Sequence, residues 1–178
     1  MKNLLYLLLL VPCFVFAQSA EYGSFKIMNT EIIYQKVFIQ DSVTNEKLAA
    51  FLKTVPNVSN VEIGADGIQA DLTDFAVDFK KFGFSQVAVP TLIQTGRYNA
   101  KIKVDGKAGK YRVTLKSMQV KGDAGYKKIA SPDNFTNYAG LNSGTVLNKD
   151  WCKPNSLGLL EKAITDRFTF KEKDSADW

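Results

Sequence analysis

The sequence YNAKIKVDGKAGKYRVTL, residues 98–115, alternates apolar and polar side chains on both sides of a glycine-containing turn. Successive side chains of a strand point to opposite faces, so this pattern predicts two strands of a hairpin with one buried and one solvated face. The apolar set is Tyr98, Ala100, Ile102, Val104, Tyr111, Val113 and Leu115. The first expectation is therefore an antiparallel sheet.

Further strands are predicted before this hairpin. Residues 30–40 are rich in β-branched and aromatic side chains, which is typical of a well-covered strand. Residues 58–63 and 68–72 flank the turn Gly-Ala-Asp-Gly (64–67), whose glycines and aspartate tolerate positive φ, and this predicts a second hairpin. The alternation slips at Thr73-Asp74, which predicts a bulge.

Two helices are also predicted. Thr44 is placed as an N-cap before an apolar stripe that stops at Pro56. A C-terminal helix is expected over residues 155–170, where Leu157, Leu160, Ile164 and Phe168 recur at helical spacing. Residues 121–154 are expected to be mostly a long loop, either functional or partly mobile.

These elements predict the fold class and the layout of the chain. We expect an α+β domain with an antiparallel sheet of about five strands, a helix after the first strand and a helix at the C-terminus. Residues 18–29 form a lead-in, residues 30–120 form the main domain, the C-terminal helix packs on that domain, and residues 171–178 form a tail.

A resemblance is carried by the strand followed by the helix at Thr44, by Phe82-Gly83-Phe84, by Val89-Pro90 and by GKYRVTL (109–115). On these residues the chain resembles a family of exported bacterial domains of unknown function with a TATA-binding-protein-like (TBP-like) fold. The resemblance covers about residues 30–120 and implies a curved antiparallel sheet with helices on one face. It implies no activity and no DNA binding, because a fold does not define a function.

The N-terminus has the layout of a secretory signal peptide over residues 1–17. Lys2 is followed by an apolar run and then by Val15-Phe16-Ala17. The run is too short for a spanning helix, which needs roughly 20 apolar residues. A lipoprotein anchored at Cys13 is the weaker alternative, because Val11-Pro12 lacks the small residues that such processing favours. We therefore expect an exported protein, periplasmic or extracellular, with no stable transmembrane segment after cleavage.

Composition excludes several chemistries. The chain has no histidine, which removes the commonest general base and transition-metal ligand. Cys152 stands alone once the signal peptide is removed, and we expect a partly buried, inert thiol beside Trp151. We predict no metal and no cofactor. The 23 basic and 18 acidic residues leave a formal net charge of +5, a mild excess that indicates solubility and not nucleic-acid binding.

Two groups of residues are candidate binding sites for a glycan, peptide or protein partner. Alternation places Lys101, Lys103, Arg112 and Lys116 on one solvated face, where they form a cationic patch. Phe135, Tyr138 and Trp151 lie among Asn and Gly residues and offer stacking surfaces. The alternative interpretations are solvated strand residues for the first group and ring packing under the loop for the second.

A carboxylate-based glycoside hydrolase is the alternative function. This chemistry needs two carboxyl groups and neither histidine nor metal. The candidates are Asp66, Asp71, Asp74 and Asp78. Their spacing does not require a facing pair, and turn or surface positions explain them better. The sequence therefore favours a non-catalytic binding module over an enzyme.

Overall fold

The computed structural model describes residues 20–41 and 43–170. The predicted signal peptide and tail lie outside these residues. At the centre of the sheet, the predicted hairpin pairs β6 (Arg97–Lys107) with β7 (Lys110–Asp123), and Ile102 lies opposite Leu115. Both apolar side chains are buried. The alternation in residues 98–115 therefore predicted both the pairing and the buried face.

The sheet contains more strands than the sequence pattern predicted. Its order is β1-β2-β3-β7-β6-β5-β4, with β8 paired to β7 outside this path, and every pair is antiparallel. The other strands are β1 (Glu21–Tyr22), β2 (Phe25–Met28), β3 (Glu31–Ile39), β4 (Val58–Gly64), β5 (Gly67–Phe75) and β8 (Lys128–Asn134). The described residues thus form an eight-stranded sheet within the predicted α+β class, and the expectation of five strands was too low.

Two missed strands lie in the predicted lead-in. β1 and β2 turn through Gly23, with φ +57°, and β2 and β3 turn through Asn29 and Thr30, with φ +52° and +60°. The second turn needs left-handed backbone at two positions but contains no glycine, so the usual hairpin signal is absent. Phe25 is nevertheless fully buried against Tyr34, which makes these strands part of the core.

The expectation that residues 121–154 are mostly loop was wrong. They include the end of β7, β8, the short helix α3 (Thr136–Ala139), β9 (Gly140–Leu141) and β10 (Val146–Leu147). β8 has the sequence KIASPDN, which does not alternate and includes Pro132. Proline is tolerated on edge strands, so the pairing depends on the free edge of β7 and not on a pattern in β8 itself.

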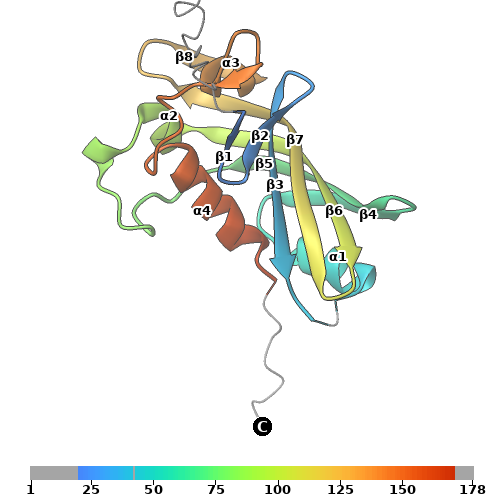
Figure 1. Cartoon of the computed structure of the whole chain (residues 1–178). Coiled ribbons are helices and arrows are strands. Elements are labelled where there is room, and N and C mark those ends of the chain that lie inside the picture. The colour runs from blue at the N-terminus through green and yellow to red at the C-terminus, as the bar shows by residue number, and fades with distance from the viewer. Residues whose placement is uncertain (1–19, 42, 171–178) are drawn as a thin grey trace, which may run out of the picture.

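The two predicted helices are present, the first with its predicted N-cap and the second two residues shorter at each end than the predicted range 155–170. In α1 (Asn45–Thr54), Thr44 Oγ1 accepts a 3.3 Å hydrogen bond from the Lys47 amide. The C-terminal helix is α4 (Leu157–Phe168), and a short helix α2 (Thr91–Thr95) and a 3-10 turn η1 (Gln86–Ala88) precede β6. In Figure 1, α4 runs alongside β3, and α1 lies at the turn end of β6 and β7. None of the helices in the described residues is long and apolar enough to cross a membrane.

The core lies between one face of the sheet and these helices. Tyr111 stacks on Phe38 at 4.9 Å between ring centroids, and its hydroxyl donates a 2.7 Å hydrogen bond to the Phe168 carbonyl at the end of α4. The predicted bulge is confirmed by the register shift between Leu72 and Phe75. The opposite face of β6 and β7 carries the charged side chains.

Candidate functional site

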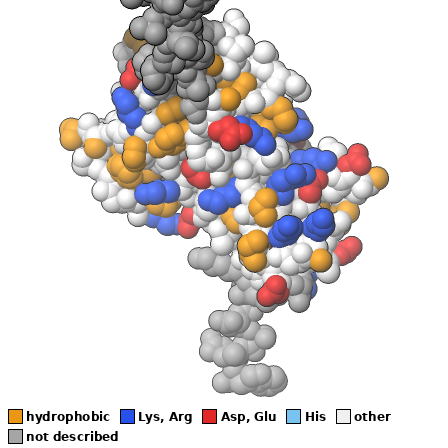
Figure 2. Space-filling model, in the orientation of Figure 1, with side chains coloured by type: hydrophobic (Ala, Val, Ile, Leu, Met, Phe, Trp, Pro, Cys, Tyr) orange, Lys and Arg blue, Asp and Glu red, His pale blue; other side chains and the backbone are white. Residues whose placement is uncertain are grey.

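The cationic residues of the hairpin lie together on the open face of the sheet, but three of them are paired with carboxylates. Lys101 Nζ lies 2.7 Å from Asp71 Oδ1. Lys103 and Arg112 share Asp105, at 3.3 Å and 2.8 Å. Figure 2 shows basic side chains gathered over β6 and β7 with acidic ones between them. This face therefore carries basic and acidic side chains paired across neighbouring strands, and it is not a purely cationic patch.

These pairs also set the acidity of the two aspartates. Hydrogen bonds from Asn60 and Lys101 hold the pKa of Asp71 below its usual range. Partial burial opposes ionisation of Asp105, but hydrogen bonds from Arg112 and Lys103 outweigh it and lower its pKa. Both aspartates thus remain ionised near neutral pH and neutralise part of the patch.

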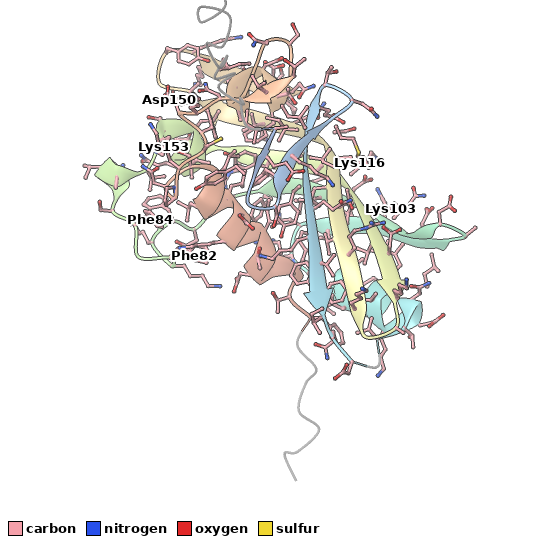
Figure 3. The ribbon with its side chains drawn as sticks, viewed as in Figure 1. Phe82, Phe84, Lys103, Lys116, Asp150 and Lys153 are labelled. Atoms are coloured by element: carbon pink, nitrogen blue, oxygen red, sulfur yellow. The ribbon has the colours of Figure 1, made fainter. Side chains whose placement is uncertain are left out.

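Lys116 lies on the same open face, beyond the paired charges. It is exposed and lies opposite Lys101 in the register of β6 and β7. Figure 3 shows Lys116 and Lys103 on neighbouring strands, well away from Asp150 and Lys153 beside α2 and α3. The two predicted groups of binding residues therefore do not form one site.

The three predicted aromatic residues occupy different environments. Phe135 is fully buried, and its ring packs edge-on against Tyr98 at 5.7 Å and Trp151 at 5.4 Å. It belongs to the core, so its prediction as a surface stacking residue was wrong, and the packing alternative holds for this ring. Tyr138 is only 9 % exposed, and Trp151 is half-buried. Both of these line a cavity.

That cavity has a volume of about 290 Å³ and is formed by four separate segments. We call it the aromatic cavity. Its lining comes from the start of α2, the turn between β7 and β8, α3 and the segment before α4: Pro90, Thr91, Leu92, Ala124, Tyr126, Tyr138, Asn148, Asp150, Trp151 and Ser156. Tyr126 is 80 % exposed, so its ring lies at the opening. Three aromatic rings thus converge from three of the four segments.

Hydrogen bonds and ring packing hold the inner wall in place. The Tyr138 hydroxyl donates a 2.7 Å hydrogen bond to Asp133 Oδ2, and Asn137 Nδ2 donates to the same carboxylate. Burial and the bond to Asp133 raise the pKa of Tyr138 to about 12. The hydroxyl is already partnered, so the ring can offer its apolar surface to the cavity. The Trp151 ring is supported by Phe135 behind it.

Ser156 is the unusual polar residue of this cavity. It is 1 % exposed, and within residues 20–41 and 43–170 its Oγ is the buried side-chain atom left without a hydrogen-bond partner. Ser156 is the N-cap residue of α4, yet its side chain does not cap the helix. The amides of Leu157 and Gly158 instead donate to the carbonyls of Trp151 and Lys153. The hydroxyl is therefore a buried polar group with no hydrogen-bond partner among the described residues, and it does not reach the open part of the cavity.

A larger groove of about 730 Å³ is lined by one face of α4 together with Tyr22, Gly23, Lys36 and Phe82. Its polar groups bind one another: Ser24 Oγ donates to Glu161 at 2.6 Å, and Lys36 Nζ lies 3.6 Å from Glu161. At its edge, Lys162 lies over the ring of Phe84, at 5.6 Å from the centroid. These satisfied pairs explain the groove as ordinary helix packing, so the smaller aromatic cavity is the better candidate.

The candidate catalytic carboxylates do not converge on one cavity in the same way. Asp74 pairs with Lys121 at 2.8 Å, and Asp78 accepts a hydrogen bond from the Lys81 amide. Asp66 is exposed in the turn between β4 and β5. Asp71 lines a depression of about 280 Å³, and Asp78 lines another of about 310 Å³. Each aspartate therefore has a local structural role or an exposed position.

Cys152 follows Trp151 and is half-buried. Burial raises the pKa of its thiol, so the reactive thiolate is disfavoured. This environment agrees with the expectation of an unreactive thiol.

Sequence reasoning missed several lining residues. Tyr126 had a usable signal, since it is a single aromatic residue in a glycine-containing turn. Ser156 had none, because serine at a predicted helix start indicates an ordinary cap. Ser156 is distinguished only by the burial of its Oγ with no hydrogen-bond partner in the described part of the chain.

No family model and no curated protein matches the sequence. Two solved structures are similar to the chain. One is a DUF4468 family protein from Bacteroides ovatus, with a TM-score of 0.46 and 14% identity, over 85% of this chain and 94% of that one. The other is a TBP-like protein from Parabacteroides distasonis, with a TM-score of 0.49 and 13% identity, over 82% of this chain and 96% of that one. Both descriptions agree with the resemblance stated from the sequence.

Proposed function

We propose that this protein is a non-catalytic binding module of the cell envelope, and that the aromatic cavity holds one residue of a glycan or peptide partner. The observation that carries the proposal is the convergence of Tyr126, Tyr138 and Trp151 on one small cavity. Small-molecule sites combine apolar and aromatic walls with a few polar groups that fix orientation. Here Asn148 and Asp150 supply the polar groups.

The envelope location rests on the N-terminal sequence, with its basic start, short apolar run and small-residue exit. The proposed partners, glycans and peptides, are abundant outside the cytoplasmic membrane. The open face of the sheet is a separate surface in this proposal, because its cations are largely neutralised and it does not adjoin the cavity.

Catalysis is less well supported than binding. A glycosidase needs one carboxylic acid whose pKa is raised, so that it can donate a proton. In the described residues, each carboxyl group with a shifted pKa has that pKa lowered: Glu46, Asp71, Asp74, Asp105 and Asp133. These groups favour the ionised form and are unsuited to the role of general acid.

The proposal is tested by titrating the mature protein with panels of neutral glycans and of short peptides while recording amide NMR spectra. We expect at least one compound to shift the resonances of Tyr126, Tyr138 and Trp151 together. Tyr126→Ala removes one stacking surface and should weaken this binding by roughly 2- to 10-fold.

The matched control is Ile39→Ala, because Ile39 is 79 % exposed and lies at the end of β3. This control should bind like the unmodified protein. Equal weakening in both variants, or ligand-induced shifts only on the open face of β6 and β7, contradicts the assignment of the cavity as the binding site.

A further inference from the structure

We propose that the open face of the sheet, at the end where β6 turns into β7, docks on the surface of a bilayer that contains anionic lipid. We call this part of the sheet the turn-end surface, and it consists of Val37, Ile39, Lys107, Lys110 and Arg112. It shares no residue with the lining of the aromatic cavity, so binding at one does not require the other.

Strand pairing places these five side chains on one face. Val37 lies opposite Arg112 in the register of β3 and β7. Ile39 lies opposite Lys110 in the same register, and Lys110 lies opposite Lys107 across the β6–β7 turn. Directly opposite residues of an antiparallel pair project to the same side of a sheet. In Figure 1, the end of β3 and the β6–β7 turn lie at the same end of the molecule.

Two apolar side chains of this surface are left in water. Val37 is 50 % exposed and Ile39 is 79 % exposed. They lie two residues apart on β3, so alternation places both on the open face. Removing such side chains from water is favourable in proportion to their apolar area. A small soluble anion leaves them in water, whereas the boundary between headgroups and acyl chains of a bilayer covers them.

The cations of this surface are less neutralised than those farther along the sheet. Lys107 and Lys110 are exposed, and within residues 20–41 and 43–170 neither has an ion-pair partner. Arg112 shares the carboxylate of Asp105 with Lys103. An anionic leaflet attracts each basic side chain that comes close to it. The two free lysines are therefore the main electrostatic contribution to docking.

The elements around the turn leave this end of the sheet positive. Asp41 lies beside Gly109, and α1 begins against Gly106. The basic side chains here outnumber the acidic ones: Lys47, Lys103, Lys107, Lys110 and Arg112 against Asp41, Glu46 and Asp105. Figure 2 shows basic and hydrophobic side chains next to one another over this end of β3 and β7. The charge of the surface thus complements an anionic leaflet.

A depression of about 440 Å³ lies among these side chains. Its lining is formed by one residue of β3 and by the β6–β7 turn with its flanking residues: Val37, Asp105, Gly106, Lys107, Lys110, Tyr111 and Arg112. This volume lies in the range of sites for small ligands. Ammonium and guanidinium groups are the usual partners of phosphate in proteins. The depression therefore suits one phosphate-bearing headgroup, with Ile39 beside it at the acyl boundary.

The test measures sedimentation of the mature protein with vesicles. One set contains phosphatidylcholine mixed with phosphatidylglycerol, and the other contains phosphatidylcholine alone. We expect binding to the mixed vesicles at low salt, weaker binding at high salt because salt screens exposed charges, and little binding to phosphatidylcholine alone. Absence of binding to the mixed vesicles at low salt overturns the proposal.

A double variant, Lys107→Ala with Lys110→Ala, tests the electrostatic part. Its affinity for the mixed vesicles should fall by roughly 10- to 30-fold, since each basic side chain near the surface contributes to binding. The matched control is Lys127→Ala with Lys128→Ala, which removes the same charge from exposed positions at the start of β8. Equal losses in the two double variants mean that only net charge matters, and they overturn the turn-end surface as the docking site.

Ile39→Ser tests the apolar part without changing the charge. Affinity for the mixed vesicles should fall by roughly 3- to 20-fold, because an exposed isoleucine no longer enters the interface. Ile63→Ser is the matched control, since Ile63 is 52 % exposed and lies opposite the buried Ile68, on the other face of the sheet. This control should bind like the unmodified protein.

A soluble polyanion separates a bilayer from a charged polymer. Dextran sulfate should bind more weakly than the mixed vesicles, and its binding should be unchanged by Ile39→Ser because a polymer of charges offers no acyl boundary. Dextran sulfate binding as tight as vesicle binding, or vesicle binding that Ile39→Ser leaves unchanged, overturns the lipid surface as the partner.

Discussion

The Tyr138 hydroxyl donates a 2.7 Å hydrogen bond to Asp133 Oδ2, and this bond joins α3 to the end of β8. Through it, the position of one wall of the aromatic cavity depends on an aspartate outside the cavity lining. The same bond is the largest cause of the lowered pKa of Asp133.

Tyr138→Phe should therefore destabilise the protein by about 1 kcal/mol at pH 7, the usual contribution of a hydrogen bond. The folded-state pKa of Asp133 is depressed, so its stabilising contribution is present above the unfolded pKa of about 3.9 and is lost as pH falls through the folded value. Urea unfolding of both proteins at pH 7 and pH 3 should show a smaller difference at pH 3. A difference that stays constant with pH contradicts the coupling to Asp133.

Phe135→Ala should destabilise the protein by about 3 to 5 kcal/mol, because it empties a fully buried site between Tyr98 and Trp151. Chemical denaturation measures this change. Phe84→Ala is the comparison variant, since Phe84 is a partly buried phenylalanine outside this cluster and should cost less. Equal losses in the two variants disagree with the placement of Phe135 in the core.

Asp105→Asn should strengthen the salt-sensitive binding of the open face to an anionic surface, with little loss in the free energy of unfolding. Asp105 neutralises both Lys103 and Arg112, and its removal leaves two adjacent cations without a carboxylate. Exposed pairs of this kind contribute about 0 to 1 kcal/mol each. Retention on a cation-exchange column should increase, as it should for Asp71→Asn. A large drop in stability at neutral pH argues instead for a structural role of this pair.

Tyr111→Phe should loosen the end of α4. The Tyr111 hydroxyl donates to the Phe168 carbonyl at 2.7 Å and accepts from the Phe170 amide at 2.8 Å. Loss of both bonds should cost about 1 to 3 kcal/mol and speed hydrogen exchange of the Phe170 amide. Amides in β4, far from this contact in the sheet order, serve as the internal control. Unchanged protection of Phe170 contradicts this anchoring role.

Much of the fold was predictable from local pattern. Period-two alternation predicted β6 and β7, and the slip at Thr73-Asp74 predicted a real register shift. Thr44 predicted the start of α1, since its capping bond requires only neighbouring residues. The missed strands of the main sheet, β1, β2 and β8, are short or irregular and depend on partners elsewhere in the chain.

The candidate site was predictable only in part. The position of Tyr138 and Trp151 among Asn and Gly residues, which is typical of binding loops, predicts that they bind a partner, and they do line the cavity. The same argument predicts a surface position for Phe135, but Phe135 lies in the core, because composition does not distinguish the buried side of a segment from its exposed side. The lysines and arginine were correctly placed on one face, but their pairing with Asp71 and Asp105 depends on side-chain distances across strands.

The sequence by itself determined the α+β class, the central hairpin with its buried and solvated faces, and the absence of histidine chemistry. These follow from residue identity and from periodicity, which act over a few neighbouring residues. Only the tertiary structure decided that Tyr126, Tyr138, Trp151 and Ser156 line one cavity and that Ser156 Oγ is buried with no hydrogen-bond partner among the described residues. The physical reason is that burial and hydrogen-bond partners arise from contacts between distant segments, which no local pattern encodes.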